Sequence, residues 1–189
     1  YLVEKAITKK TKAIMPVHLT GRMARMDDLE KISAKYKIPL IEDAAQAIGS
    51  KYKNKPAGSW GKVGCFSTHP LKNLNACGDG GMLTTNDESI ARKIKSLRNH
   101  GLMDRNTVEQ FGYVSRMDTI HASILNYRVK KLGKVIKTRR QIAEMYFEKL
   151  SHLPIELPKE NNHEFNSYHT FVIQAEGRDK LKSKLLEQN

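Results

Sequence analysis

Two charged side chains follow apolar runs that are typical of buried strands. Asp43 ends the run that starts at Ile38, and Lys72 lies five residues beyond Ser67, the last residue of a second run. In an open parallel sheet, ligands bind outside the carboxyl ends of the strands, so a carboxylate and an amine there could bind one ligand together. Each residue also has a simpler interpretation, since Asp43 could cap a helix and Lys72 could be a surface charge.

A glycine cluster and a histidine belong to the same part of the chain. The cluster is Gly78-Asp-Gly-Gly81, shortly after Lys72. Glycine permits the backbone to come close to a bound group, but a tight turn explains the cluster equally well. His18 ends an apolar run, so we expect it at the same edge of the sheet as Asp43, although an isolated histidine is more often structural.

The elements that must position these residues form a strand–helix–strand unit. An apolar run at 13–18, a helical pattern at 26–37 and a second apolar run at 38–43 follow one another. This order predicts a βαβ unit, a parallel sheet and the α/β class. Further strands are expected at 63–67, 80–85 and 168–173, helices at about 87–99, 118–150 and 178–187, a loop or short hairpin at 51–64 and a loop at 100–117.

Length and composition indicate a globular protein. Of the 189 residues, 39% are hydrophobic and 28% are charged, which is typical of folded chains and not of disordered ones. No apolar run approaches the ~18 residues that span a bilayer, and two cysteines make no disulfide framework. We therefore expect no membrane insertion and a cytoplasmic location. The first residue is Tyr1 and not Met, so we expect a fragment of a longer chain.

The net charge is unusually positive. Lys and Arg number 33 against 20 Asp and Glu, a formal net charge of +13, which favours polyanions or phosphate-bearing small molecules. The densest basic stretch, 130–140, lies on an expected helix, where a solvated face is the simpler interpretation. Aromatic RNA-binding motifs, zinc-ligand spacing and a helix-turn-helix pattern are missing. A basic nucleic-acid-binding domain is therefore an alternative without a supporting motif, and no metal site is expected.

Several short motifs together resemble the DegT-type (DegT/DnrJ/StrS) sugar aminotransferases, which are pyridoxal-phosphate enzymes with the aspartate aminotransferase fold. The motifs are Pro16-Val-His-Leu19, Glu42-Asp-Ala-Ala-Gln46, Ser67 followed by Lys72-Asn-Leu74, Gly78-Asp-Gly-Gly81, Leu97-Arg-Asn-His-Gly101, Ser115-Arg-Met-Asp118 and Tyr168-His169. The resemblance covers nearly the whole chain but only the second half of the family's length. It implies part of a fold-type-I large domain with a mostly parallel sheet at 1–130, and part of a small C-terminal α/β domain at 131–189.

The resemblance also implies roles for four residues. Lys72 matches the lysine that holds pyridoxal 5'-phosphate as a Schiff base and shuttles the proton, and lysine is the side chain suited to bind an aldehyde in this way. Asp43 matches the carboxylate that pairs with the pyridine nitrogen. Gln46 matches a residue near the phenolic oxygen of the ring, and Ser67 matches a hydroxyl that binds the phosphate.

Other positions are matched less fully. His18, His100 and Tyr168 are candidates for the substrate side, and His69 has no assigned role. The family usually has Asn where this chain has Val114, and that Asn reaches across a dimer to the phosphate of the partner's cofactor. Val114 cannot donate such a bond, so the resemblance leaves the contact between subunits in question.

The implied function is amino-group transfer to a keto sugar attached to a nucleotide, with glutamate as the expected donor. Such reactions serve polysaccharide, lipopolysaccharide or amino-sugar biosynthesis, and a homodimer is expected. One alternative is a non-catalytic fragment that keeps the motifs but cannot bind pyridoxal phosphate alone. The other is the basic nucleic-acid-binding domain mentioned above.

Overall fold

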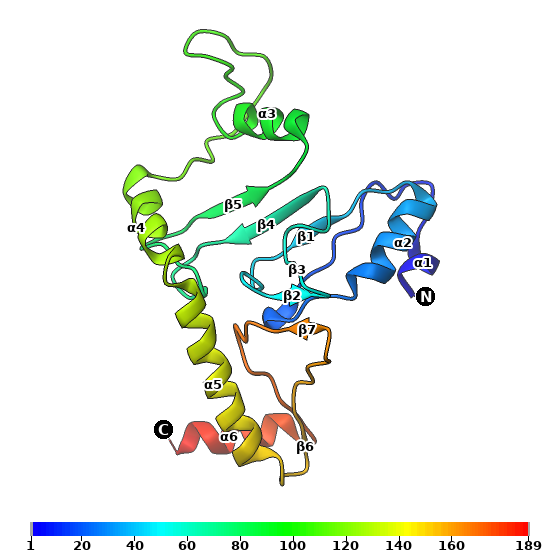
Figure 1. The fold of residues 1–189 in the computed structure, drawn as a ribbon, viewed down its shortest axis with the longest axis vertical. Helices are drawn as coiled ribbons and strands as arrows, with labels where there is room; N and C mark the ends of the chain where they lie inside the picture. Colours follow the sequence, from blue (N-terminus) through cyan, green and yellow to red (C-terminus); the bar gives the residue numbers. More distant parts are fainter. Residues whose placement is uncertain (1, 189) are drawn as a thin grey trace.

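The computed structural model describes residues 2–188, which form an α/β structure with several small sheets (Figure 1). The helices are α1 (Leu2–Ala6), the 3-10 segment η1 (Leu19–Gly21), α2 (Met26–Tyr36), α3 (Glu88–Leu97), α4 (Thr119–Val129), α5 (Leu132–Leu150) and α6 (Arg178–Glu187). The strands are β1 (Ile41–Asp43), β2 (Lys51–Tyr52), β3 (Lys55–Pro56), β4 (Val63–Ser67), β5 (Gly81–Thr84), β6 (Ile155–Glu156), β7 (Glu164–Phe165) and β8 (Gln174–Ala175).

The central sheet has the strand order β1-β4-β5. β1 and β4 are parallel, as expected, but β5 is antiparallel to β4. The loop 68–80 returns at the edge where it left, because Ser67, the last residue of β4, pairs with Gly81, the first residue of β5. The expected strand at 13–18 is reduced to two parallel bridges, Ile14 with Leu40 and Val17 with Asp43. The sheet is therefore mixed.

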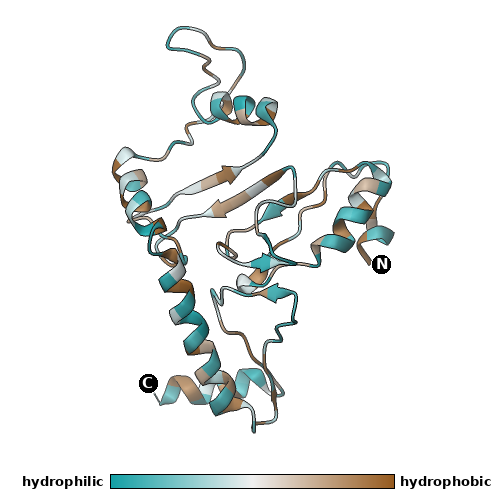
Figure 2. Cartoon of the chain, viewed as in Figure 1, coloured by the Kyte–Doolittle hydropathy of each residue, from teal (hydrophilic) through white to brown (hydrophobic). Residues whose placement is uncertain are grey.

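A compact apolar cluster lies between α2 and the central sheet. Its buried members include Met26, Leu40 and Ala47, and Met26 has no exposed surface. Glu30, Lys31 and Lys35 of α2 are exposed, and hydrophilic residues make up much of the helix (Figure 2). The helix ends at Tyr36 and is capped by Lys37, whose φ of 54° lies in the left-handed region. This cluster fixes the strand that carries Asp43.

The long helix expected at 118–150 is two helices. α4 ends at Val129, α5 begins at Leu132, and the amide of Lys131 bonds to the carbonyl of Arg128 three residues back, which is the tighter 3-10 pattern. Two features favour a break here. Gly133 weakens the start of α5, and the Arg128 side chain turns away to the carbonyl and side chain of Asn75, at 2.7 and 2.6 Å.

The expected strand at 168–173 is not formed. Arg139 donates to the carbonyls of Tyr168 and His169, at 3.3 and 3.1 Å, and Tyr168 has a left-handed φ of 44°. These carbonyls are therefore not free to form a ladder, and the nearby strand β8 starts only at Gln174. The helix at 178–187, the hairpin within 51–64 and the loop at 100–117 are confirmed.

The C-terminal part of the chain returns to the N-terminal part. β7 pairs antiparallel with β2, with Phe165 opposite Lys51, and the resulting sheet has the order β3-β2-β7. Figure 1 shows this return beside η1 and β2, at the end of the central sheet. Among residues 2–188, no helix has the length and apolar character needed to cross a membrane.

Candidate functional site

Two of the candidate residues end neighbouring parallel strands. Asp43 closes β1 opposite Cys65 of β4, and Ser67 lies two residues further along β4, opposite Gly81. The Asp43 carboxylate is half-buried and its Oδ1 accepts a hydrogen bond of 3.1 Å from the amide of Ala45. The parallel register therefore brings a carboxylate and a hydroxyl to the same edge of the sheet.

Gln46 lies in the turn that follows β1. Its Oε1 accepts a hydrogen bond of 2.8 Å from the amide of Thr20, a residue of η1 with a left-handed φ of 63°. The side-chain oxygen is thus used to tie two loops together. The amide NH2 of Gln46 is the end that can donate to a ligand.

Lys72 lies in the loop 68–80, which we call the lysine loop. Its amide donates to the carbonyl of His69 at 2.9 Å, while the amide of Thr68 donates to Gly80 at 2.8 Å and that of Ala76 to Thr68 at 2.7 Å. The lysine loop is therefore closed by its own backbone. Lys72 itself is half-buried.

Lys72 is electrostatically coupled to the segment 166–170, which we call the returning segment. The pKa of His169 is lowered first by burial and then by the positive charges of Lys72 and Arg139. Such coupling requires the charged groups to lie near the imidazole, since it weakens with distance and with exposure to water. The lysine loop and the returning segment therefore share one environment.

Buried polar atoms without partners gather in these same two segments. Among the described residues, four side-chain atoms are buried and lack a hydrogen bond: Thr68 Oγ1, Asn73 Oδ1, Asn166 Oδ1 and His169 Nδ1. Each such atom costs about 1–3 kcal/mol unless a bound group or water satisfies it. The two segments are thus suited to receive a polar ligand.

His18 lies beside Asp43, since its backbone amide donates to the carbonyl of Asp43 at 2.9 Å, but its side chain is directed into the interior. Its side chain is fully buried, its Nδ1 accepts a bond of 3.3 Å from the amide of Ala24, and its Nε2 lies 3.0 Å from Oε2 of Glu42. Both ring nitrogens are used inside the protein. The structure therefore does not place His18 where it could reach a substrate.

Glu42 is a buried acceptor that sequence reasoning missed. Besides His18, it accepts from the amides of Gly58, Trp60 and Gly61 at 2.7–2.8 Å. Burial raises the pKa of Glu42, but the bonds from His18 and these amides outweigh it, so the pKa lies below its ordinary value. Alternation along β1 is the signal that could have found it, since neighbours of Asp43 face the other side of the strand.

Tyr168 and His100 occupy very different surroundings. Tyr168 is buried, its hydroxyl donates to Glu160 at 3.0 Å, and burial followed by the charge of Glu160 raises its pKa to about 12. His100 is exposed in the loop that follows α3, which extends away from the central sheet (Figure 1). Val114 lies in the same loop, residues 98–117, which we call the distal loop, and forms an isolated antiparallel β-bridge with Asn99.

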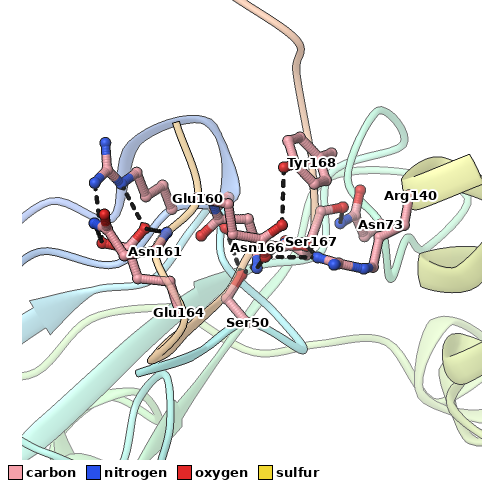
Figure 3. Close-up of polar contacts among 11 residues, drawn as sticks. Ser50, Asn73, Arg140, Glu160, Asn161, Glu164, Asn166, Ser167 and Tyr168 are labelled. Atoms are coloured by element: carbon pink, nitrogen blue, oxygen red, sulfur yellow. Dashed lines mark hydrogen bonds and ion pairs between the residues drawn. The ribbon is translucent and has the colours of Figure 1, made fainter. Parts of the chain in front are cut away.

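A polar network surrounds Tyr168 and was not predicted (Figure 3). Arg140 of α5 donates to Glu160 at 2.7 Å and to the carbonyl of Asn166 at 2.8 Å, and its guanidinium lies 4.4 Å from the centre of the Phe165 ring. Two cavities of about 350 Å³ flank this network, and both are lined by α5 and residues 158–173. Neither is lined by Asp43, Gln46, Ser67 or Lys72.

Residues 1–189 match the DegT/DnrJ/EryC1/StrS aminotransferase family. One relative, a "Pleiotropic regulatory protein" of Geobacillus stearothermophilus, is 41% identical over 98% of this chain and 51% of its own length. Another, a UDP-N-acetyl-3-dehydro-alpha-D-glucosamine 3-aminotransferase of Acidithiobacillus ferrooxidans, is 42% identical over 97% of this chain and 50% of its own length.

Solved structures agree with these relatives. DesV of S. venezuelae, solved with a ketimine intermediate, has a TM-score of 0.95 and 38% identity, covering 99% of this chain and 51% of its own. A putative sugar aminotransferase of Streptococcus pneumoniae, solved in its PLP form, has a TM-score of 0.91 and 25% identity, covering 99% of this chain and 55% of its own. The chain spans about half the length of the curated relatives it matches.

Proposed function

Because the chain belongs to the DegT/DnrJ/EryC1/StrS aminotransferase family, we propose that it forms the lysine-bearing part of a pyridoxal-phosphate-dependent sugar aminotransferase. One observation carries the proposal. Asp43 and Ser67 end neighbouring parallel strands, and Lys72 lies in the loop that begins directly after Ser67. This order supports the proposal that the amine of Lys72 joins the carboxylate and the hydroxyl in binding one ligand at the sheet edge.

The residues at this edge fit the polar groups of pyridoxal phosphate. When bound, the cofactor supplies a carbonyl that takes up the amino group and a ring that withdraws electrons. Asp43 would hold the proton on the ring nitrogen, because its carboxylate is an acceptor with negative charge. Ser67 would donate to the phosphate, and the NH2 of Gln46 would donate to the ring oxygen. The orphaned buried atoms of the lysine loop are further support for a polar occupant.

Lys72 would perform two tasks. Its Nζ would hold the cofactor covalently and would then accept and return a proton at the reacting carbon. Both tasks need an amine that is held at a fixed distance from the ring. The closed backbone of the lysine loop supports this assignment, because it limits the positions that Lys72 can reach.

For the acceptor, we infer a keto sugar carried by a nucleotide, with glutamate as the amino donor. The relatives include enzymes named for UDP-linked and dTDP-linked sugars. A net charge of +13 suits an acceptor that carries a diphosphate. We further propose a cytoplasmic homodimer, with residues 1–130 in a cofactor-binding domain and 131–189 in a smaller one. The break between α4 and α5 at Lys130–Lys131 supports that boundary.

Replacement of Lys72 tests the proposed function in the holoenzyme. Lys72→Ala should lower single-turnover amino transfer by at least about a thousandfold, because Ala can neither hold the cofactor nor move the proton. It should also remove the visible absorption band of the lysine-bound cofactor. Lys72→Arg should fail as well, since a guanidinium stays protonated. The exposed Lys180→Ala is the matched control and should behave as wild type.

Two outcomes would contradict this assignment. Wild-type protein without a visible band after addition of pyridoxal phosphate would favour a non-catalytic chain. A Lys72→Ala protein that kept the band and the rate would mean that another lysine holds the cofactor. Salt-sensitive retention of the wild type on random DNA would instead favour the nucleic-acid-binding alternative.

A further inference from the structure

We propose that Asn73 is a positioning residue for Lys72 and acts by fastening the lysine loop to the returning segment. The proposal rests on the proposed function, since the position of Lys72 matters only if its amine is the reacting group. It is carried by the contacts of three buried side chains: Ser50, Asn73 and Ser167.

The returning segment is fixed to the N-terminal part of the chain at Ser167. The amide of Ser167 donates to the carbonyl of Gly21 at 3.1 Å, and the hydroxyls of Ser167 and Ser50 lie 2.8 Å apart. The Ser50 hydroxyl donates to that same carbonyl of Gly21 at 2.6 Å. Ser50 and Ser167 have no exposed surface, so water does not compete for these bonds.

The returning segment also lies unusually close to the backbone of Gly21. A Cβ at Gly21 would come within 2.7 Å of the Ser167 hydroxyl oxygen and 2.8 Å of the His169 nitrogen. One position further on, the amide of Thr170 donates to the carbonyl of Thr20 at 3.3 Å, and the amide of Thr20 is itself held by Gln46. The returning segment therefore has one register against η1 and cannot slide.

Asn73 connects this fixed segment to the lysine loop. Its Nδ2 donates to the carbonyl of Ser167 at 3.4 Å, and its side chain is almost fully buried (Figure 3). Its Cα is a fixed distance of about 3.8 Å from that of Lys72, because adjacent residues share a trans peptide. Movement of Asn73 away from Ser167 would therefore carry the main chain of Lys72 with it.

The side-chain oxygen of Asn73 supports a functional role for this residue. Its Oδ1 is buried without a partner, so a leucine of similar shape would avoid that cost. Polar groups kept at a cost in stability are typical of functional sites. His169 follows Ser167 by two residues, and its pKa is lowered in part by the charge of Lys72.

The substitution Asn73→Leu in the holoenzyme tests the proposal. It removes the bond to Ser167 and the orphaned oxygen together. We expect the Tm of the cofactor-free protein to stay the same or rise, while kcat falls about tenfold and KM changes by less than about twofold. The visible absorption band of the bound cofactor should shift or weaken. Asn161→Leu is the matched control, because it also removes an amide donor bond, that to Glu164 at 2.8 Å, but away from Lys72.

Ser167→Ala is the second variant and decides the matter if Asn73→Leu does not fold. It keeps the backbone carbonyl that Asn73 binds but removes the hydroxyl contact with Ser50, so a smaller loss of kcat at unchanged KM is expected. Wild-type kcat and absorption in either folded variant would overturn the proposal. A fall in kcat with a parallel fall in Tm and an unchanged band would also overturn it, because loss of packing alone gives that result. Lys72→Ala, measured alongside, tests the proposed function separately.

Discussion

The region around β1 and the distal loop 98–117 are held together in different ways. Buried side chains surround β1. Met26 and Leu40 belong to the apolar cluster, and Glu42 is fully buried and makes polar contacts. The distal loop owes its shape to backbone bonds, such as those from the amides of 113 and 115 to the carbonyls of 97 and 98, at 2.7 and 2.9 Å. Most of its apolar side chains are exposed, and that of Phe111 is fully exposed. The side chains around β1 are therefore packed within the chain, whereas the distal loop exposes apolar surface that a partner could cover.

Glu42→Gln should have the largest effect and would test how far the first region depends on one buried group. The carboxylate accepts from His18 and from three backbone amides, and an amide side chain would present NH2 to some of these donors. We expect the free energy of unfolding to fall by about 3–5 kcal/mol. Chemical denaturation measures this. Asp104→Asn removes a carboxylate that caps two amides in the distal loop, and it should change stability far less. Equal losses of stability in the two variants would show that the two regions do not differ in how far they depend on a carboxylate.

Gly21→Ala should have an intermediate effect. Gly21 has a φ of 93°, and a Cβ would press on Ser167, so we expect a loss of about 1–3 kcal/mol. Gly133 in α5 has no atom within 4 Å of the place of a Cβ, and Gly133→Ala should raise stability by up to about 1 kcal/mol through helix propensity. Thermal unfolding of both variants gives the comparison. A neutral Gly21→Ala would mean that the returning segment can move aside.

Phe111→Ala should have the smallest effect on the stability of the chain itself, within about 0.5 kcal/mol, because the ring contacts little. If the distal loop meets a second copy, the same change should weaken association. Sedimentation over a range of protein concentrations measures it. A loss of stability above about 2 kcal/mol would show that Phe111 is packed in solution, and the contrast between the two regions would fail.

Much of the fold could be predicted because it depends on local patterns. The helix at 26–37, the strand ending at Asp43 and the strand at 63–67 follow from apolar spacing, and Asp87 caps α3 through the amides of Ser89 and Ile90. The direction of β5 could not be predicted, because it depends on how the lysine loop closes. The break after α4 depends on Arg128 reaching Asn75, a contact between residues distant in sequence.

The candidate site divides in the same way. Asp43 and Ser67 could be placed at one sheet edge from their positions at strand ends, and the register agrees with that placement. The roles proposed for them, and for Gln46 and Lys72, remain predictions. Ser50 and Asn73 could not be found from the sequence, because their importance arises from a segment about a hundred residues later in the chain.

The return of β7 to β2 connects α5 mechanically to the N-terminal part of the chain. A force that moved α5 would act through Arg140 on the carbonyl of Asn166, and from there on the bonds that Ser167 makes with Gly21 and Asn73. The contacts from Arg140 through Asn166 to Ser167 follow one another, so each transmits the same force, which then divides between Gly21 and Asn73. Part of a force on the C-terminal part would therefore reach Asn73, one residue from Lys72.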